Sequence, residues 1–176
     1  MTRISLEPMA QAMSAVEAMN LRQKEALTDE IFLAQPHMLG SVLVLPKLGV
    51  SMEKTEFAIE LLLLCFQAMK ESGRTWPLIT EDDQELQQRI YVTTVMLGED
   101  LSPMQRERLM QQYMGNHPEQ NLLACIGART VDWLERIDPE DSDRYVMLAA
   151  ANFVNCIAFV PLPAFRKSSR RPWSVR

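Results

Sequence analysis

The sequence predicts an all-α fold, a single-domain helical bundle of about seven to eight helices. Glycine occurs only six times and methionine twelve times in 176 residues, and this composition favours helices because glycine weakens helix interiors whereas methionine is a good helix former. Apolar residues recur every three or four positions along most of the chain. Serine, threonine, proline and glycine separate these periodic stretches as helix start and stop signals.

The first quarter of the chain predicts two amphipathic helices and a short third one. A helix to about Asn20 carries apolar residues at three-to-four spacing: Leu6, Met9, Met13, Val16 and Met19. A second helix, or a bent extension of the first, follows over 21–35 and ends before Pro36. Residues 37–50 contain an apolar run at 42–45 that periodicity assigns to neither helix nor strand. We expect a short helix followed by a loop there.

The middle of the chain predicts the central helix and two capped neighbours. Residues 52–72 are apolar nearly all round, which is typical of a helix surrounded by others. Thr80 with Asp83 is a capping pattern for a helix over 80–98. Ser102, followed by Pro103, predicts another helix over 103–114.

The last two predicted helices span 118–137 and 139–160, each opened by a proline. Residues 145–165 contain no charged side chain and precede a basic tail, a pattern that a membrane anchor shares with a buried helix. Pro161 limits the helical part to about 15 residues, or roughly 22 Å. Because the hydrocarbon layer is roughly 30 Å thick, we predict a core helix and expect no membrane association.

Charge divides the chain into a helical domain at 1–165 and a basic, flexible tail at 166–176. The net charge is −5, but five of the 18 basic residues lie in the tail, so residues 1–165 hold 13 basic against 23 acidic residues, a net charge of −10. An acidic body repels nucleic acid, so contact with phosphates would have to run through the tail. The candidate phosphate contacts are Arg166, Lys167, Arg170, Arg171 and Trp173.

The cysteines indicate a reducing compartment. Cys65, Cys125 and Cys156 are odd in number, far apart and placed in apolar helical segments, so we interpret them as reduced core residues. Glu7 interrupts the N-terminal apolar residues, so no secretory signal is predicted there. We therefore expect a cytoplasmic protein.

No catalytic, cofactor-binding or metal-binding site is predicted. The two histidines, His37 and His117, each stand beside a proline and lack metal-ligand spacing, so loop or capping roles are expected. The glycines are scattered singly, which does not predict a phosphate-binding loop. Gly127 lies inside a predicted helix, and we expect another helix to pack closely against it.

The first functional hypothesis is a non-enzymatic cytoplasmic protein that binds a protein partner, of the accessory, adaptor or immunity type. Its predicted partner surface is the hydrophobic segment formed by Val42, Leu43, Val44, Leu45 and Leu48. The methionine pairs Met9 with Met13 and Met110 with Met114 are predicted to be core, with an adaptable partner surface as the alternative. The alternatives are a nucleic-acid-associated accessory factor that uses the tail and a helical domain that binds a small ligand between helices. Homo-oligomerisation stays open.

Overall fold

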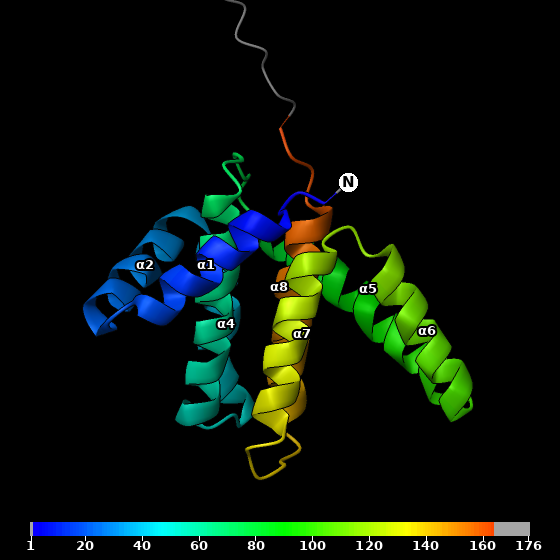
Figure 1. Cartoon of the computed structure of the whole chain (residues 1–176). Coiled ribbons are helices and arrows are strands. Elements are labelled where there is room, and N and C mark those ends of the chain that lie inside the picture. The colour runs from blue at the N-terminus through cyan, green and yellow to red at the C-terminus, as the bar shows by residue number, and fades with distance from the viewer. Residues whose placement is uncertain (1, 164–176) are drawn as a thin grey trace, which may run out of the picture.

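The computed structural model describes residues 2–163, apart from the side chains at positions 97 and 99, and these residues form a single-domain all-α bundle (Figure 1). No strand occurs among them. The elements are α1 (Leu6–Ala18), α2 (Leu21–Ala34), α3 (Pro36–Leu43), the short 3-10 helix η1 (Leu45–Leu48), α4 (Met52–Glu71), α5 (Glu81–Glu99), α6 (Pro103–Asn116), α7 (Gln120–Leu134) and α8 (Asp143–Phe159). The predicted fold class and helix order are confirmed.

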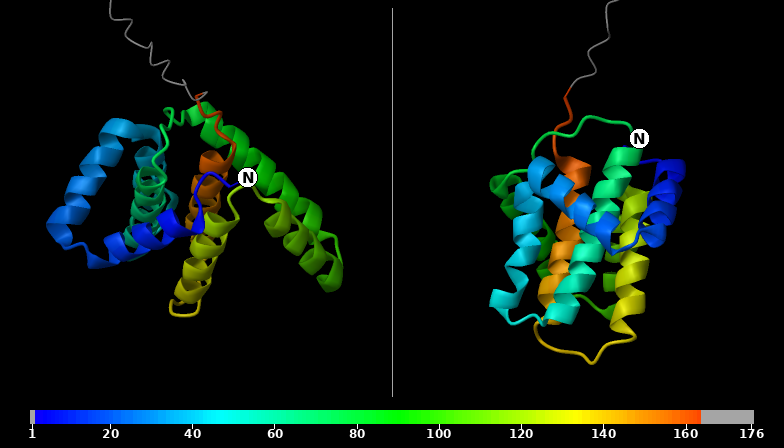
Figure 2. Two further views of the ribbon diagram at one scale, coloured as in Figure 1. Left: turned by 45° about the horizontal axis from the view of Figure 1, so that its top comes forward. Right: turned by 90° about the vertical axis from the view of Figure 1, so that its left-hand side faces the viewer.

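Helices α4 and α8 form the centre of the core, with α7 beside α8 (Figures 1 and 2). The predicted central helix α4 is buried on all sides from Ala58 to Met69, apart from Ile59 and Glu60. Helix α1 packs across α4 and also touches α7, while α3 covers part of α4 and α8. The ring of Phe57 on α4 stacks on Trp133 of α7 with centroids 4.6 Å apart.

Three helix starts are fixed by capping contacts, and the starts predicted at Thr80 and Ser102 are confirmed. Asn20, Thr80 and Ser102 each accept a hydrogen bond from the backbone N–H three residues later, and the side chain at that third position binds back to the capping residue. These reciprocal capping boxes satisfy backbone donors that a helix start otherwise leaves unpaired. The box at Asn20 also shows that α2 is a separate helix and not an extension of α1.

Two predicted helix starts differ from the structure. Helix α7 begins at Gln120 instead of 118, because the Glu119 side chain is engaged by the N-terminal segment. Helix α8 begins at Asp143 instead of 139, because the Asp143 carboxylate accepts the Glu140 N–H at 2.8 Å and closes a turn ahead of the helix.

A buried ion pair holds the turn between α7 and α8 in place. Lys54 of α4 donates to Asp143 at 2.6 Å and pairs with Glu140 at 3.0 Å, and it also donates to the Asp138 carbonyl at 3.1 Å. Burial lowers the pKa of Lys54, but the hydrogen bonds to Asp143 and Glu140 outweigh it, so the pKa is raised overall. Lys54 is therefore charged at neutral pH and ties the start of α4 to the start of α8.

The structure decides two expectations that the sequence left open, the conformation of residues 42–45 and the packing around Gly127. The run 42–45 is helical: it closes α3 and begins η1, which ends at Gly49 in the left-handed region (φ 88°). The expected close packing against Gly127 is wrong, because a Cβ built there would meet no atom within 4 Å.

The uncharged stretch 145–165 behaves as a core helix as far as it is described. Helix α8 ends at Phe159, two residues before Pro161, and most of its second half is buried. Within residues 2–163 no single helix has both the length and the apolar character of a membrane span, although the bent pair Leu21–Ala34 and Pro36–Leu48 (116°) meets these criteria jointly.

Candidate protein-binding surface

Helices α5 and α6 form an antiparallel hairpin that diverges from the other helices (Figures 1 and 2). The hairpin is held together along its inner side: Leu109 lies 3.7 Å from an ideal Cβ on Gly98, and the Arg106 Nε–H donates to the Gly98 carbonyl at 3.1 Å. The Tyr91 and Tyr113 rings lie 6.3 Å apart between the two helices. Beyond its base, where α5 packs on α8, the hairpin has few other neighbours.

The hairpin exposes an unusual amount of apolar surface. No residue of α6 is buried, and Gln84 and Gly98 are the only buried residues among those described on α5. Leu86 and Ile90 are 51% and 52% exposed, and Met110 and Met114 are 45% and 46% exposed. We define the hairpin surface by its exposed apolar residues: Leu86, Ile90, Val95, Met96, Met104, Met110 and Met114.

The hairpin surface has two parts because α5 carries two apolar stripes. Tyr91, Val95 and Gly98 face α6 and line a cavity of about 70 Å³ with Leu109 and Met110. Leu86 and Ile90 are spaced by four residues and therefore lie together on another face of the same helix. Large exposed apolar patches mark interaction sites in soluble proteins.

The predicted core position of the methionine pairs is correct for one pair and wrong for the other. Met9 is buried in the bundle and Met13 packs against the core. Met110 and Met114 are exposed, because α6 contacts α5 and α7 and none of the described helices covers its other side. Their flexible thioethers suit a surface that adapts to a partner.

The predicted partner surface at 42–48 is divided by the fold. Val42 and Leu45 are buried in the core, whereas Leu43, Val44 and Leu48 are exposed. Lys47 stands next to the last of these in η1. The exposed part is thus smaller than the hairpin surface and is a secondary candidate. The predicted phosphate contacts, Arg166, Lys167, Arg170, Arg171 and Trp173, lie outside the described residues.

The end of α6 is fixed to α8 by a buried polar network. His117 is the C-cap of α6, which agrees with its predicted capping role. Its Nδ1 accepts the Glu119 N–H at 3.1 Å, so in the neutral ring the proton is on Nε2, which donates to Asn155 Oδ1 at 3.1 Å. The Tyr113 hydroxyl donates to the same oxygen at 2.8 Å. Burial raises the pKa of Tyr113, which keeps it a donor at neutral pH.

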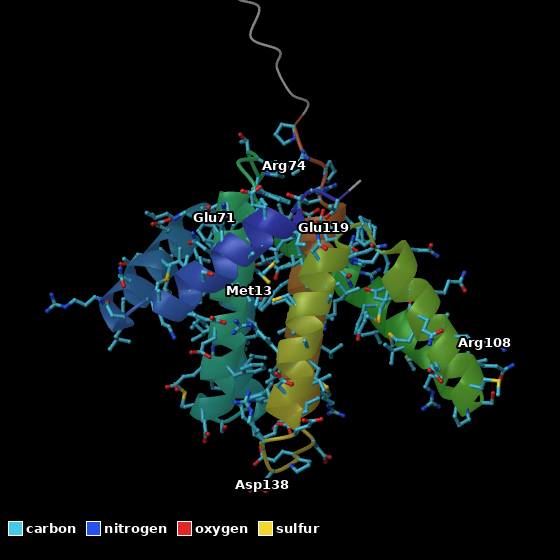
Figure 3. All side chains as sticks on the ribbon, viewed as in Figure 1. Met13, Glu71, Arg74, Arg108, Glu119 and Asp138 are labelled. Atoms are coloured by element: carbon cyan, nitrogen blue, oxygen red, sulfur yellow. The ribbon has the colours of Figure 1, made fainter. Side chains whose placement is uncertain are left out.

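A second polar cluster holds the N-terminal segment against the start of α7. The buried Glu119 carboxylate accepts the Thr2 hydroxyl at 2.8 Å and the backbone N–H groups of Arg3 at 2.5 Å and Ile4 at 3.0 Å. The Arg3 guanidinium donates to two carbonyls at the end of α8, those of Ile157 and Val160. Figure 3 shows Glu119 at this end of the bundle, far from Arg108 on the hairpin. The cluster is a structural clamp.

The three cysteines are free thiols of unequal accessibility. Cys65 and Cys156 are buried, and Cys125 is half-buried beside Arg129. Burial raises the pKa of all three thiols, to about 12 for Cys156, while Arg129 partly opposes the rise at Cys125.

We expect iodoacetamide at pH 8 to alkylate Cys125 at least about tenfold faster than Cys65 or Cys156, because the thiolate is the reacting species and the other two sulfurs are shielded. Peptide mass spectrometry of a time course measures the three rates, and the denatured chain, in which all three should react alike, is the control. Equal rates in the folded protein would contradict this packing.

Across residues 2–163, His, Cys, Asp and Glu side chains nowhere gather in groups of three or more that could hold a metal ion. Comparison with protein-family models, with curated proteins and with solved structures found no match to this chain. The function is therefore argued from the surface itself.

The sequence contains a signal for the hairpin surface that simple periodicity overlooks. Leu86 and Ile90 follow a four-residue spacing, while Tyr91, Val95 and Gly98 follow a second series of three and four on the same helix. When a helix has two apolar faces, other helices must cover both of them, or one face stays exposed to solvent. Only the packing shows that the face with Leu86 and Ile90 is exposed.

Proposed function

We propose that this protein is a non-enzymatic, cytoplasmic interaction protein of the accessory, adaptor or immunity type, whose α5–α6 hairpin binds a cationic amphipathic helix of a partner protein. The observation that carries the proposal is the hairpin surface, where large apolar side chains are exposed on two helices that leave the bundle. Covering such side chains is the main source of binding free energy in protein association.

A helix suits the hairpin surface in shape. Helix α5 has 19 residues, a length of roughly 28 Å. Leu86 and Ile90 stand one turn apart, and the methionines of α6 can repack around different side chains. Helix-in-groove recognition uses such a surface to receive apolar anchors from successive turns of the partner helix.

The charge of the hairpin favours a cationic partner. Seven acidic residues and three arginines lie between positions 81 and 116, so the hairpin carries a net charge of −4. The body as a whole is acidic too, with 23 acidic residues against 13 basic ones over residues 1–165. Complementary charge steers association and disfavours partners of like charge.

The test uses two synthetic 20-residue helical peptides with identical leucine positions, one with lysine and one with glutamate on the polar face. We expect the lysine peptide to bind and the double variant Leu86→Gln, Ile90→Gln to weaken this binding at least about tenfold, since central apolar anchors dominate interface energetics. Fluorescence anisotropy with labelled peptide measures both affinities.

The matched control is Phe32→Gln, Leu33→Gln, which removes two exposed apolar residues from α2 without touching the hairpin. It should change the affinity less than about twofold. Equal binding of the two peptides, or equal loss in both double variants, would refute the proposal. A dimer in sedimentation velocity that is lost only in the hairpin variant would show that a second copy occupies the surface and would also refute it.

A further inference from the structure

A surface cavity at the base of the hairpin is lined by polar side chains to which the preceding sections assign no role. It has a volume of about 470 Å³ and lies between α3 and α5, with Asn152 of α8 on its wall. Its polar lining includes His37 and Ser41 of α3 and Glu81, Gln84, Glu85 and Gln88 of α5. The cavity is separate from the exposed apolar residues that define the hairpin surface.

Gln84 is the feature that points to a ligand. Gln84 is only 7% exposed. Its Oε1 is the one buried side-chain polar atom without a hydrogen-bond partner among the described residues. Its Nε2 donates weakly to the Thr80 carbonyl at 3.5 Å, and reversing the amide would place two oxygens against each other. A buried acceptor without a donor is unfavourable in a folded protein, so such a group calls for an explanation.

The neighbouring groups also present acceptors. The Ser41 hydroxyl already donates its hydrogen to the Met38 carbonyl at 2.7 Å, which leaves only oxygen lone pairs free. His37 Nδ1 lies 3.2 Å from Glu81 Oε1, and when Nδ1 donates there the Nε2 of the neutral ring is an acceptor. A ligand with several N–H donors would suit these acceptors.

The charge of the lining selects a cation. Glu81 and Glu85 both line the cavity; Glu85 binds Arg89 at 2.7 Å through one oxygen, and Glu81 binds His37 through one oxygen. The second oxygen of each carboxylate takes no part in these two ion pairs. The positive end of the α5 dipole does not make this an anion site, because the capping box of Thr80 and Asp83 already engages the first turn.

We propose that this cavity binds an organic cation with several N–H donors, a guanidinium or primary ammonium group, with Gln84 Oε1 and the Glu81 and Glu85 carboxylates as acceptors. Gln84 lines the cavity but its Oε1 is buried, so binding requires the side chain to rotate until this oxygen faces the ligand. The same group can come from a free amine or from an arginine or lysine side chain of a protein. The inference does not depend on the hairpin proposal, since it uses different residues and a different ligand.

The test is isothermal titration of the intact protein with ethylguanidine and with the neutral analogue ethylurea, and with a capped Ala-Arg-Ala peptide and its citrulline counterpart. Each cation should bind at least about tenfold more tightly than its neutral analogue, because charge-assisted hydrogen bonds are the stronger ones. Gln84→Met and the double variant Glu81→Gln, Glu85→Gln should each weaken cation binding at least about tenfold.

Gln84→Met has a second readout that separates lost function from lost folding. Methionine has a similar length and removes the unpaired acceptor, so the melting temperature without ligand should rise by about 2 °C. The glutamate double variant is matched by Glu107→Gln, Glu135→Gln, two exposed positions away from the cavity, which should leave the affinity unchanged.

The outcomes are distinct. Ethylguanidine binding that depends on Gln84 supports the cavity as a site for a free cation. Binding of the arginine peptide alone, with the same dependence on Gln84, supports it as a site for a protein side chain. Absence of binding by either cation, or binding that neither variant weakens, overturns the proposal. Loss of amphipathic-peptide binding with intact ethylguanidine binding would refute the hairpin proposal alone.

Discussion

Replacing Phe153 by alanine is expected to lower the free energy of unfolding by about 4 kcal/mol. Phe153 is 1% exposed and lies in the middle of α8, the helix that α4, α5 and α7 all contact. The loss combines the transfer free energy of the ring with the cost of the cavity left among helices that cannot all move inward. A domain of ordinary stability would lose a large part of its folding free energy.

Urea denaturation followed by far-ultraviolet circular dichroism measures this change. Phe32→Ala is the matched control, because Phe32 is 62% exposed on α2 and its truncation should cost less than about 1 kcal/mol. Phe153→Leu should fall between the two, since leucine refills part of the space. Equal denaturation midpoints for Phe153→Ala and Phe32→Ala would contradict the position of α8 at the centre of the bundle.

Replacing Glu119 by glutamine is expected to lower the free energy of unfolding by about 3 kcal/mol. The two carboxylate oxygens accept three hydrogen bonds, from Thr2 and from the N–H groups of Arg3 and Ile4. Glutamine keeps the shape but turns one acceptor into a donor, so at least one buried N–H or O–H is left facing another donor. It also removes the negative charge near the partly buried guanidinium of Arg3.

Denaturation in urea gives the total effect, and hydrogen exchange locates it. The amides of Arg3 and Ile4 should lose protection, whereas those of α4 and α8 should keep their order of protection. Glu135→Gln, at an exposed position, is the control and should change the free energy by less than about 0.5 kcal/mol. Unchanged exchange at Ile4 in Glu119→Gln would contradict the clamp.

The local sequence predicted the helices well because helix formation depends on neighbouring residues. The capping pairs at Thr80 and Ser102 mark the starts of α5 and α6 to within one residue, since both partners of each pair lie within four positions. The predicted starts of α7 and α8 were early by two and four residues. In both cases a long-range partner decides the boundary: the segment Thr2–Ile4 for Glu119 and Lys54 for Asp143.

Local patterns did not show which apolar residues of the hairpin are exposed or that Gln84 is buried. Met110 and Met114 have the spacing of a core face, and they are exposed because no helix within residues 2–163 covers that side of α6. Gln84 is a polar residue on a helix rich in glutamine, and its burial without a partner for Oε1 follows from the packing of α5 against α8. Exposure and unpaired burial depend on residues far apart in sequence.

The sequence by itself determined the all-α class, the order of the helices, the central position of α4 and the acidic charge of the body. These properties follow from composition and from periods of three to four residues, which act within one helix. The tertiary structure alone decided that the α5–α6 hairpin diverges from the bundle and that Glu119, Lys54 and Gln84 are buried. The physical reason is that burial, ion pairing and exposure arise between helices, whose relative positions no local pattern encodes.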